Sequence, residues 1–319
     1  MSPFAFFVGS GRSGTTLYRN IFDSHSELAM THEAHFVVPL VRNRRRYEGE
    51  GFDVARFVDD LYRNPNFRRQ GLDRVDVEAA LAAAPPEDTA AAVRIVFSTY
   101  AARHGKRRYG DKTPGYVTGI GLLADVFPES RFVHIIRDGR DVALGYLDRD
   151  EWGPSTLADA AFYWASRVRR GQASGRQLGA TRYTESRYED LVADPEAVTR
   201  RLCGFLDLEY EDGMMRYHER GAEFIAATRD PQAFGGLARP VTKGMRDWRT
   251  EMEPDDVLRF EAIAGDLLAE LGYELTGVSV PASLKLDVAR ARLGWERQRL
   301  AARLQPFTAK VRRRAGSPS

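Results

Sequence analysis

An apolar segment that runs directly into a glycine-rich turn constrains the fold of this chain more than any other feature. Residues 4–8 read Phe-Ala-Phe-Phe-Val, the pattern of a buried strand, and residues 9–16 follow as Gly-Ser-Gly-Arg-Ser-Gly-Thr-Thr. A helix is predicted from Leu17 onward. A strand, a glycine turn and a helix in this order direct backbone N–H groups and a helix N-terminus at a phosphate group.

The turn departs from an ATP- or GTP-binding loop at one decisive position. Such loops read Gly-x-x-x-x-Gly-Lys-Ser/Thr, and the lysine reaches the β- and γ-phosphates. Here Gly9 and Gly14 have the required spacing, but Thr15 occupies the lysine position and the cation of the loop is Arg12. The sequence therefore predicts a phosphate site for a nucleotide that has no γ-phosphate to hold.

The composition is that of an ordinary globular chain. Its 319 residues are 43% hydrophobic and 29% charged, which is enough for one sizeable core. No apolar run approaches the roughly 20 residues that span a bilayer, and we expect the N-terminal apolar segment to be a core strand and not a signal peptide. Cys203 is the single cysteine and lies among apolar residues, so we expect a buried thiol, a reducing compartment and a cytoplasmic protein. Nothing resembles a nucleic-acid-binding module.

Predicted strands alternate with predicted helices along the chain. This alternation favours an α/β fold with a P-loop-like parallel β-sheet flanked by helices. We expect one α/β domain over residues 1–281, with a helical insertion at about 37–108 that forms part of a substrate pocket, and a basic helical extension over 282–319. The strands are predicted at 4–8, 131–136 and 182–187, and the helices at 17–23, 56–62, 77–83, 90–104, 141–147, 157–172, 195–206 and 254–271.

The C-terminal extension is an arginine-rich amphipathic helix. Residues 282–319 contain ten Lys and Arg against two acidic residues, a net charge of +8, so residues 1–281 carry −6. Apolar residues recur every seven positions, and we expect an interruption at Pro306. Three interpretations stay open: docking on the acidic body, pairing with a second copy as a homodimer, or peripheral contact with an anionic membrane or acceptor. The apolar positions are Leu286, Leu293, Leu300 and Phe307, with Leu304 and Val311 beside them.

A second strand ends in phosphate-binding chemistry. Residues 131–136 form the predicted strand, and Arg137-Asp138-Gly139-Arg140-Asp141 follow it. Arg137 is placed at the carboxyl edge of the sheet, where open α/β folds bind ligands. Asp138 invites comparison with the magnesium-binding aspartate of nucleotide hydrolases, but Arg137 puts a cation where a metal site needs none. Two such strand ends fit a donor with two separate phosphates and no metal.

These two motifs together resemble the 5′- and 3′-phosphate-binding motifs of the sulfotransferases that use 3′-phosphoadenosine 5′-phosphosulfate (PAPS). The closest likeness is to the branch that contains tyrosylprotein sulfotransferases and many bacterial enzymes. It covers roughly residues 4–275 and leaves the basic tail outside. Besides the two phosphate motifs, it is carried by Thr31-His32-Glu33, Gly110-Asp111-Lys112-Thr113-Pro114, Arg187-Tyr188-Glu189-Asp190-Leu191 and Lys243-Gly244-Met245-Arg246-Asp247-Trp248.

The resemblance assigns the donor site. The turn and the start of the first helix would hold the 5′-phosphate, Arg12 would neutralise charge that develops on the sulfuryl group, and Arg137 would grip the 3′-phosphate through its planar fork. Tyr188 would contact the nucleotide, although a core aromatic side chain explains it equally well. The nucleotide-binding residues expected from the resemblance are Gly11, Arg12, Ser13, Gly14, Thr15, Thr16, Arg137, Tyr188 and Lys243.

The resemblance also implies the catalytic groups. Glu33 corresponds to the general base that takes the proton from an acceptor hydroxyl, with His32 and His35 as rival bases. The alternative for Glu33 is a solvated or capping carboxylate. Lys112 corresponds to the lysine near the leaving oxygen, and its alternative is an ordinary surface lysine. The histidines lack the HExxH spacing of a zinc site, so no metal is expected.

One position departs from the family pattern. Members of the family usually have a serine eight residues after the motif arginine, where it helps to hold the 3′-phosphate, and this chain has Gly145. A missing hydroxyl contact is worth on the order of 1 kcal/mol. Arg140, Arg239 and Lys243 are the candidates for replacing it.

The sequence therefore predicts a metal-independent sulfotransferase that moves a sulfuryl group from PAPS to a hydroxyl group. Sugars, phenols, lipids and peptidyl tyrosine all stay open as acceptors. A P-loop small-molecule kinase is the first alternative, and Thr15 in the lysine position argues against it. A catalytically inactive nucleotide-binding adaptor is the second, and only Gly145 favours it.

Overall fold

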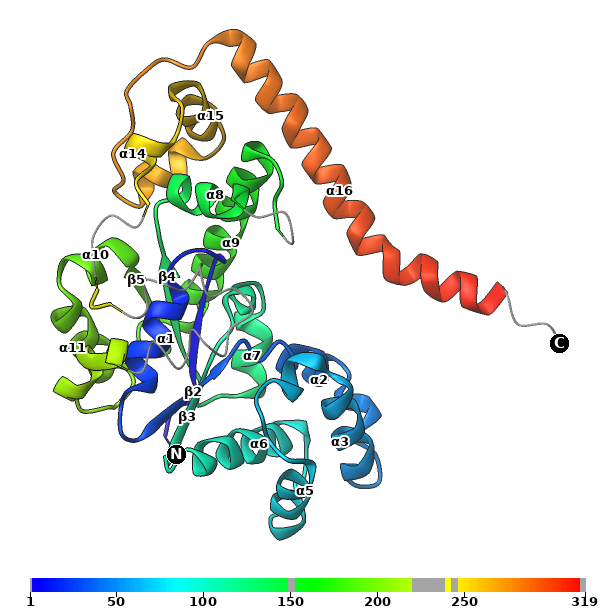
Figure 1. Ribbon diagram of the computed structural model, residues 1–319. Coiled ribbons are helices and arrows are strands. Elements are labelled where there is room, and N and C mark those ends of the chain that lie inside the picture. The colour runs from blue at the N-terminus through cyan, green and yellow to red at the C-terminus, as the bar shows by residue number, and fades with distance from the viewer. Residues whose placement is uncertain (1, 149–152, 220–238, 242–245, 316–319) are drawn as a thin grey trace. The chain divides into compact units, whose positions relative to one another are not determined.

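The computed structural model describes residues 2–148, 153–219, 239–241 and 246–315 (Figure 1). They belong to two compact units. The first comprises residues 1–137 and 167–245, and the second comprises residues 138–166 and 246–319. The boundary predicted between residues 281 and 282 was drawn from the change in charge and composition along the chain. The two compact units do not test it, and it stays a prediction.

A five-stranded parallel sheet forms the centre of the first unit. Its order is β2-β3-β1-β4-β5, and every neighbouring pair is parallel. The predicted fold class, a parallel sheet with helices around it, is confirmed. The strands are β1 (Ala5–Gly9), β2 (Leu28–His32), β3 (Arg108–Lys112), β4 (Arg131–Ile136) and β5 (Tyr183–Arg187).

Strands β2 and β3 were not predicted from the sequence. β3 reads Arg-Tyr-Gly-Asp-Lys and has one large hydrophobic side chain, yet Asp111 and Lys112 are buried. β2 is only five residues long and ends in Thr31 and His32. Both strands end in polar groups whose burial depends on their neighbours across the sheet, which periodicity along the chain does not show.

Alternation along β1 fills both faces of the sheet. Phe4, Phe6 and Val8 pack into one apolar cluster with the helices that follow β2. Ala5 and Phe7 pack into the other, with α1 (Thr15–Asp23) and α11 (Pro195–Phe205). A strand that is apolar on both faces lies in the interior of a parallel sheet, so the first predicted element is also the centre of the fold.

The remaining helices of the first unit cover these two faces. Those between β2 and β3 confirm the helical insertion predicted at about 37–108. Within the insertion, Arg44–Arg46 are exposed and do not pack into the core. The insertion consists of α2 (Val37–Arg42), η1 (Arg44–Arg46), α3 (Val54–Arg63), α4 (Pro65–Arg68), α5 (Arg74–Ala83) and α6 (Thr89–Arg103), and the other helices are η2 (Pro114–Thr118), α7 (Ile120–Val126), α10 (Tyr188–Ala193) and η3 (Asp212–Glu219).

The second unit consists of helices. α9 (Leu157–Leu178) begins in it and ends in the first unit. No described helix of either unit has the length and apolarity needed to cross a bilayer. The helices that lie entirely in the second unit are α8 (Gly139–Leu147), α14 (Trp248–Glu251), α15 (Pro254–Glu270) and α16 (Ala282–Ala315).

The interruption predicted at Pro306 is wrong, because α16 is one helix from Ala282 to Ala315. An interior proline removes one backbone hydrogen bond and kinks a helix without always ending it.

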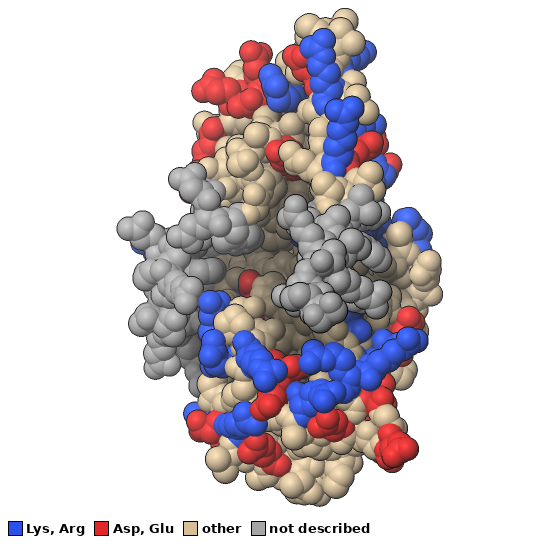
Figure 2. Space-filling view, turned by 90° about the vertical axis from the view of Figure 1, so that its right-hand side faces the viewer, with Lys and Arg blue, Asp and Glu red and all other residues tan. Residues whose placement is uncertain are grey.

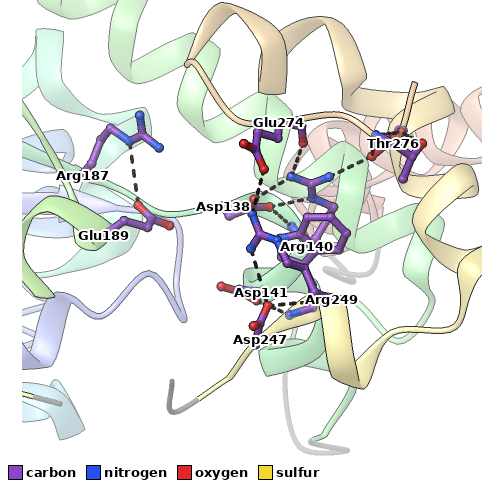
Figure 3. Close-up of polar contacts among 11 residues, drawn as sticks. Asp138, Arg140, Asp141, Arg187, Glu189, Asp247, Arg249, Glu274 and Thr276 are labelled. Carbon is purple, nitrogen blue, oxygen red and sulfur yellow. Dashed lines mark hydrogen bonds and ion pairs between the residues drawn. The ribbon is translucent and has the colours of Figure 1, made fainter. Parts of the chain in front are cut away.

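A buried arginine organises the second unit (Figure 3). Arg140 is fully buried and forms a bidentate ion pair with Asp138, with Nε–Oδ1 3.0 Å and Nη2–Oδ2 2.8 Å. It also donates to Glu261 Oε1 and to the backbone oxygen of Glu274, both at 2.8 Å. Its guanidinium carbon lies 3.6 Å from the ring centroid of Trp248. These contacts join the start of α8 to α15 and to the segment after it.

Candidate active site

The turn after β1 has the backbone of a ligand-binding loop. Arg12 has φ 68° and Gly14 has φ 80°, both in the left-handed region that glycine prefers. Gly9 allows a close approach to β4, because a Cβ there would lie 2.5 Å from the backbone oxygen of Ile135. Ser13 is 1% exposed, and its Oγ has no hydrogen-bond partner among the described residues. An orphaned buried hydroxyl in a helix-opening turn suits a bound phosphate.

Tyr188 and Arg137 lie beside this turn. A Cβ on Gly14 would be 2.3 Å from Cδ2 of Tyr188, so the ring packs directly on the glycine. The guanidinium carbon of Arg137 lies 4.5 Å from the centroid of the same ring, and Arg137 is only 7% exposed. The tyrosine hydroxyl of Tyr18 in α1 is 2.8 Å from Ser186 Oγ and donates to the Arg187 backbone oxygen at 3.0 Å, which ties α1 to the end of β5. Gly14, Arg137 and Tyr188, which were all predicted to bind the nucleotide, therefore lie together.

Lys112 contacts two further residues of the sequence prediction. Its side chain is fully buried, and its Nζ lies 2.9 Å from Glu33 Oε1 and 3.3 Å from Thr16 Oγ1. The parallel register pairs His32 with Lys112, which places the residue after β2 next to the end of β3. Thr16 belongs to the first turn of α1. The proposed base, the proposed lysine and the phosphate turn thus meet at the carboxyl edge of the sheet.

Glu33 occupies a strained backbone position. Its φ is 45°, which is rare for a residue other than glycine, asparagine or aspartate. Its backbone N–H donates to the Lys112 backbone oxygen at 3.0 Å, and its Oε2 lies 3.1 Å from His35 Nε2. Burial raises the pKa of Glu33, but the nearby Lys112 charge and hydrogen bonds from His35 and Lys112 outweigh it. The net pKa is well below the usual range, so Glu33 is a carboxylate at neutral pH.

Asp111 holds the segment on both sides of Glu33. Its side chain is fully buried, and Oδ1 accepts hydrogen bonds from Thr31 Oγ1 at 2.8 Å, Thr113 Oγ1 at 3.1 Å and the Ala34 backbone N–H at 3.1 Å. Burial raises its pKa to about 6, against the opposing effect of these hydrogen bonds. The sequence prediction quoted Asp111 within a motif and gave it no role. The only signal in the sequence for a role of Asp111 was its position directly before Lys112.

The two rival bases differ from Glu33. Burial, and then the charge of Lys112, lowers the pKa of His32 to about 3. A histidine with that pKa is neutral at pH 7 and accepts protons weakly. His35 is half exposed, and its Nε2 is hydrogen-bonded to Glu33. Glu33 and His35 therefore form one hydrogen-bonded pair at this edge of the sheet, and which group takes the proton stays a prediction.

The candidates for replacing the absent serine at Gly145 fare unequally. Arg140 is wrong for this role, because Asp138, Glu261 and the backbone of Glu274 use its donors inside the second unit (Figure 3). The Arg239 backbone oxygen accepts a hydrogen bond from Tyr217, which leaves its side chain as a candidate. Lys243 lies outside the described residues.

The arginine that precedes Tyr188 has an acidic neighbour. Arg187 Nε lies 3.9 Å from Glu189 Oε2 (Figure 3). Within the described ranges, no three His, Cys, Asp or Glu side chains gather as a set of metal ligands.

Comparison with known proteins identifies the family. A family model described as "Sulfotransferase family" matches residues 3–212, which include β1 to β5 and the candidate site residues from Gly9 to Tyr188 but not Arg239 or Lys243. The match therefore spans both strand ends that carry the phosphate-binding residues.

Curated relatives and a solved structure agree with the family match. Protein-tyrosine sulfotransferase 2 of Gallus gallus is 24% identical over 281 residues, covering 85% of this chain and 70% of that protein. Protein-tyrosine sulfotransferase A of Caenorhabditis elegans is 23% identical over 280 residues, covering 86% and 68%. The solved sulfotransferase domain from the curacin biosynthetic pathway is similar in fold, with a TM-score of 0.58 and 21% identity, covering 86% of this chain and 99% of that one.

Proposed function

The chain belongs to the sulfotransferase family, and on that premise we propose that it transfers a sulfuryl group from PAPS to a hydroxyl group through the residues around Lys112. The observation that carries this proposal is the fully buried Lys112 ammonium, which contacts both Glu33 and Thr16 of the phosphate turn. One cation thus lies between the group that would accept a proton and the turn that would hold the leaving phosphate.

The chain offers donors for two phosphates of PAPS. The N–H groups at the start of α1 and the Ser13 hydroxyl would bind the 5′-phosphate, since that hydroxyl is buried and lacks a partner in the described part of the chain. Arg137, stacked on Tyr188, would bind the 3′-phosphate. When bound, PAPS supplies a sulfuryl group whose bond to the 5′-phosphate oxygen breaks as the acceptor oxygen bonds to sulfur.

Glu33 would accept the proton of the acceptor hydroxyl. It is ionised at neutral pH because Lys112 and His35 lower its pKa more than burial raises it. The same contacts make it a weak base, and weakening the Lys112 contact would raise its pKa toward a more effective value. Lys112 would then have its charge available for the leaving oxygen, where a fixed cation stabilises the charge of the transition state.

A protein tyrosine hydroxyl is the first acceptor to test. Both curated relatives are named for protein tyrosine. The helical insertion also presents four exposed arginines, Arg42 at the end of α2 and Arg44–Arg46 in η1. A band of Lys and Arg side chains crosses the lower half of the face in Figure 2, with Asp and Glu among them. Positive potential of this kind attracts an acceptor that carries negative charge.

The proposal is tested by transfer of radioactive sulfate from labelled PAPS to a tyrosine peptide with flanking acidic residues. Glu33→Gln keeps the shape of the side chain and removes the base, so kcat should fall by about 10²- to 10⁴-fold with unchanged affinity for the bisphosphate product. Glu78→Gln, an exposed glutamate paired with Arg74 in α5, is the matched control and should retain activity. Full activity of Glu33→Gln would exclude Glu33 as the base and favour His35.

A further inference from the structure

α16 presents a row of leucines that its own unit does not cover. Leu286 is 62% exposed, Leu293 57% and Leu300 58%. Their spacing of seven residues brings them back to within about 20° on a helix of 100° per residue, so they form one stripe. We call these three residues the leucine stripe. Exposed leucines in such a row are unusual on a soluble surface, where large hydrophobic side chains are normally scattered.

A different side of α16 already contacts the second unit. The ring of Trp295 stacks on Phe162 of α9 with centroids 5.4 Å apart, and Leu284, Val288 and Ala291 are half-buried on the same side. At 100° per residue, Leu293 lies about 180° around the helix from Leu284. The leucine stripe therefore faces away from the contact that holds α16 to its own unit, and docking on that unit does not account for it.

Arginines and a lysine border the leucine stripe on both sides. By helical position, four cations lie about 40–100° from Leu293: Arg290 and Arg297 on one edge, and Lys285 and Arg292 on the other, where Glu296 also lies. All four are exposed. The region from residue 282 onward carries a net charge of +8, while the rest of the chain carries −6. The partner that fits this face is thus apolar at its centre and negatively charged around it.

A second α16 does not meet these requirements. A coiled coil needs apolar residues at two positions, a and d, in each heptad. With the leucines at a, the d positions include Glu296 and Arg303, and with the leucines at d, the a positions include Arg290 and Arg297. Either alignment places charges in the seam, and two helices of the same strong positive charge repel each other.

We propose that α16 is a membrane-surface helix that binds anionic lipid bilayers, with the leucine stripe among the acyl chains and the bordering cations on the headgroups. A basic amphipathic helix with a narrow apolar face lies in the bilayer interface in this way. The inference does not depend on the proposed sulfuryl transfer, because α16 contributes no residue to the candidate active site.

Vesicle co-sedimentation of the full chain tests the proposal. The chain should bind vesicles of 70% phosphatidylcholine and 30% phosphatidylserine more than about tenfold more tightly than pure phosphatidylcholine vesicles, and 0.5 M NaCl should weaken binding to the anionic vesicles. The triple variant Leu286→Ser, Leu293→Ser, Leu300→Ser should lose more than about tenfold of that affinity. Val75→Ser is the matched control, since Val75 is 74% exposed on α5.

Light scattering after size-exclusion chromatography separates the alternative occupant, and circular dichroism shows whether the triple variant keeps its helices. A dimer that the three serine substitutions convert to a monomer, without any vesicle binding by the unmodified chain, would overturn the proposal in favour of a second copy. Equal binding to neutral and anionic vesicles, or undiminished binding by a folded triple variant, would also overturn it.

Discussion

Replacing Lys112 by methionine tests how the candidate site sets the ionisation of Glu33. Methionine is nearly as long as lysine and is apolar, so Lys112→Met removes the charge from a fully buried position without opening a large cavity. Two contacts disappear with the ammonium: the 2.9 Å ion pair with Glu33 and the 3.3 Å hydrogen bond with Thr16. The hydrogen bond between Glu33 and His35 stays.

The two consequences differ in size. An opposite charge at this distance lowers a carboxyl pKa by about 1–3 units, so the pKa of Glu33 should rise by that amount in the variant. The loss of folding stability should be small. Removing one partner of a fully buried pair costs about 3–5 kcal/mol, but the Glu33 side chain is 37% exposed and water solvates the remaining carboxylate. The relevant scale is that of exposed pairs, about 0–1 kcal/mol.

The assay is kcat/KM for sulfate transfer from pH 8 down to the lowest pH at which both chains stay folded, because the low pKa of Glu33 places its acid limb below pH 4.5. Protonating Glu33 removes the base, so activity falls below its pKa, and the acid limb should lie at higher pH in Lys112→Met than in the unmodified chain by about 1–3 units. The value of kcat should fall by about 10²- to 10³-fold, as for loss of a group that stabilises developing charge. Lys106→Met, whose lysine lies 3.7 Å from Asp23, is the control. An unchanged acid limb in a folded, active Lys112→Met would refute the electrostatic coupling.

Two further substitutions probe the turn and the buried carboxyl. Gly14→Ala places a Cβ 2.3 Å from Tyr188 at φ 80°, so the turn must shift and the affinity for the bisphosphate, measured by calorimetry, should fall more than about tenfold. Gly121→Ala is the control, because a Cβ there meets open space, and it should leave the affinity unchanged. Equal affinities in the two variants would show that the turn adapts. Asp111 has a raised pKa of about 6, so its ionisation opposes folding increasingly as pH rises from about 4 to 6. The free energy of unfolding of Asp111→Asn relative to the unmodified chain, measured by urea denaturation, should therefore be higher at pH 8 than at pH 5 by about 1 kcal/mol. A difference that does not change with pH would contradict the raised pKa.

The parts of the fold that the sequence predicted are those with local signals. The apolar strand and glycine turn at residues 4–16, and the strand that ends before Arg137, are encoded by adjacent residues, and the structure has strands at both places. Helices with capping signals were also predictable: Asp194 accepts a hydrogen bond from the Ala197 backbone N–H at the start of α11.

The parts that escaped prediction depend on residues far apart in the chain. β3 carries buried Asp111 and Lys112, and their burial arises from β1 and β2 on either side, not from a local apolar pattern. The φ of 45° at Glu33 is imposed by hydrogen bonds to the Lys112 backbone and, through Ala34, to Asp111. The ion pair between Arg140 and Glu261 joins residues that are 121 positions apart in the sequence. No spacing rule along one chain reveals such partners.

Calorimetric titration with 3′-phosphoadenosine 5′-phosphate, in parallel with ATP and magnesium, tests the central claim most directly. The site predicts binding of the bisphosphate without added metal and a loss of about ten- to a hundredfold in affinity for Arg137→Ala, the scale of a charge-assisted contact. Arg63→Ala, an arginine whose side chain is 71% exposed on α3, should bind as the unmodified chain does. Binding of ATP with magnesium and not of the bisphosphate, or equal bisphosphate affinity in folded Arg137→Ala, would contradict the account.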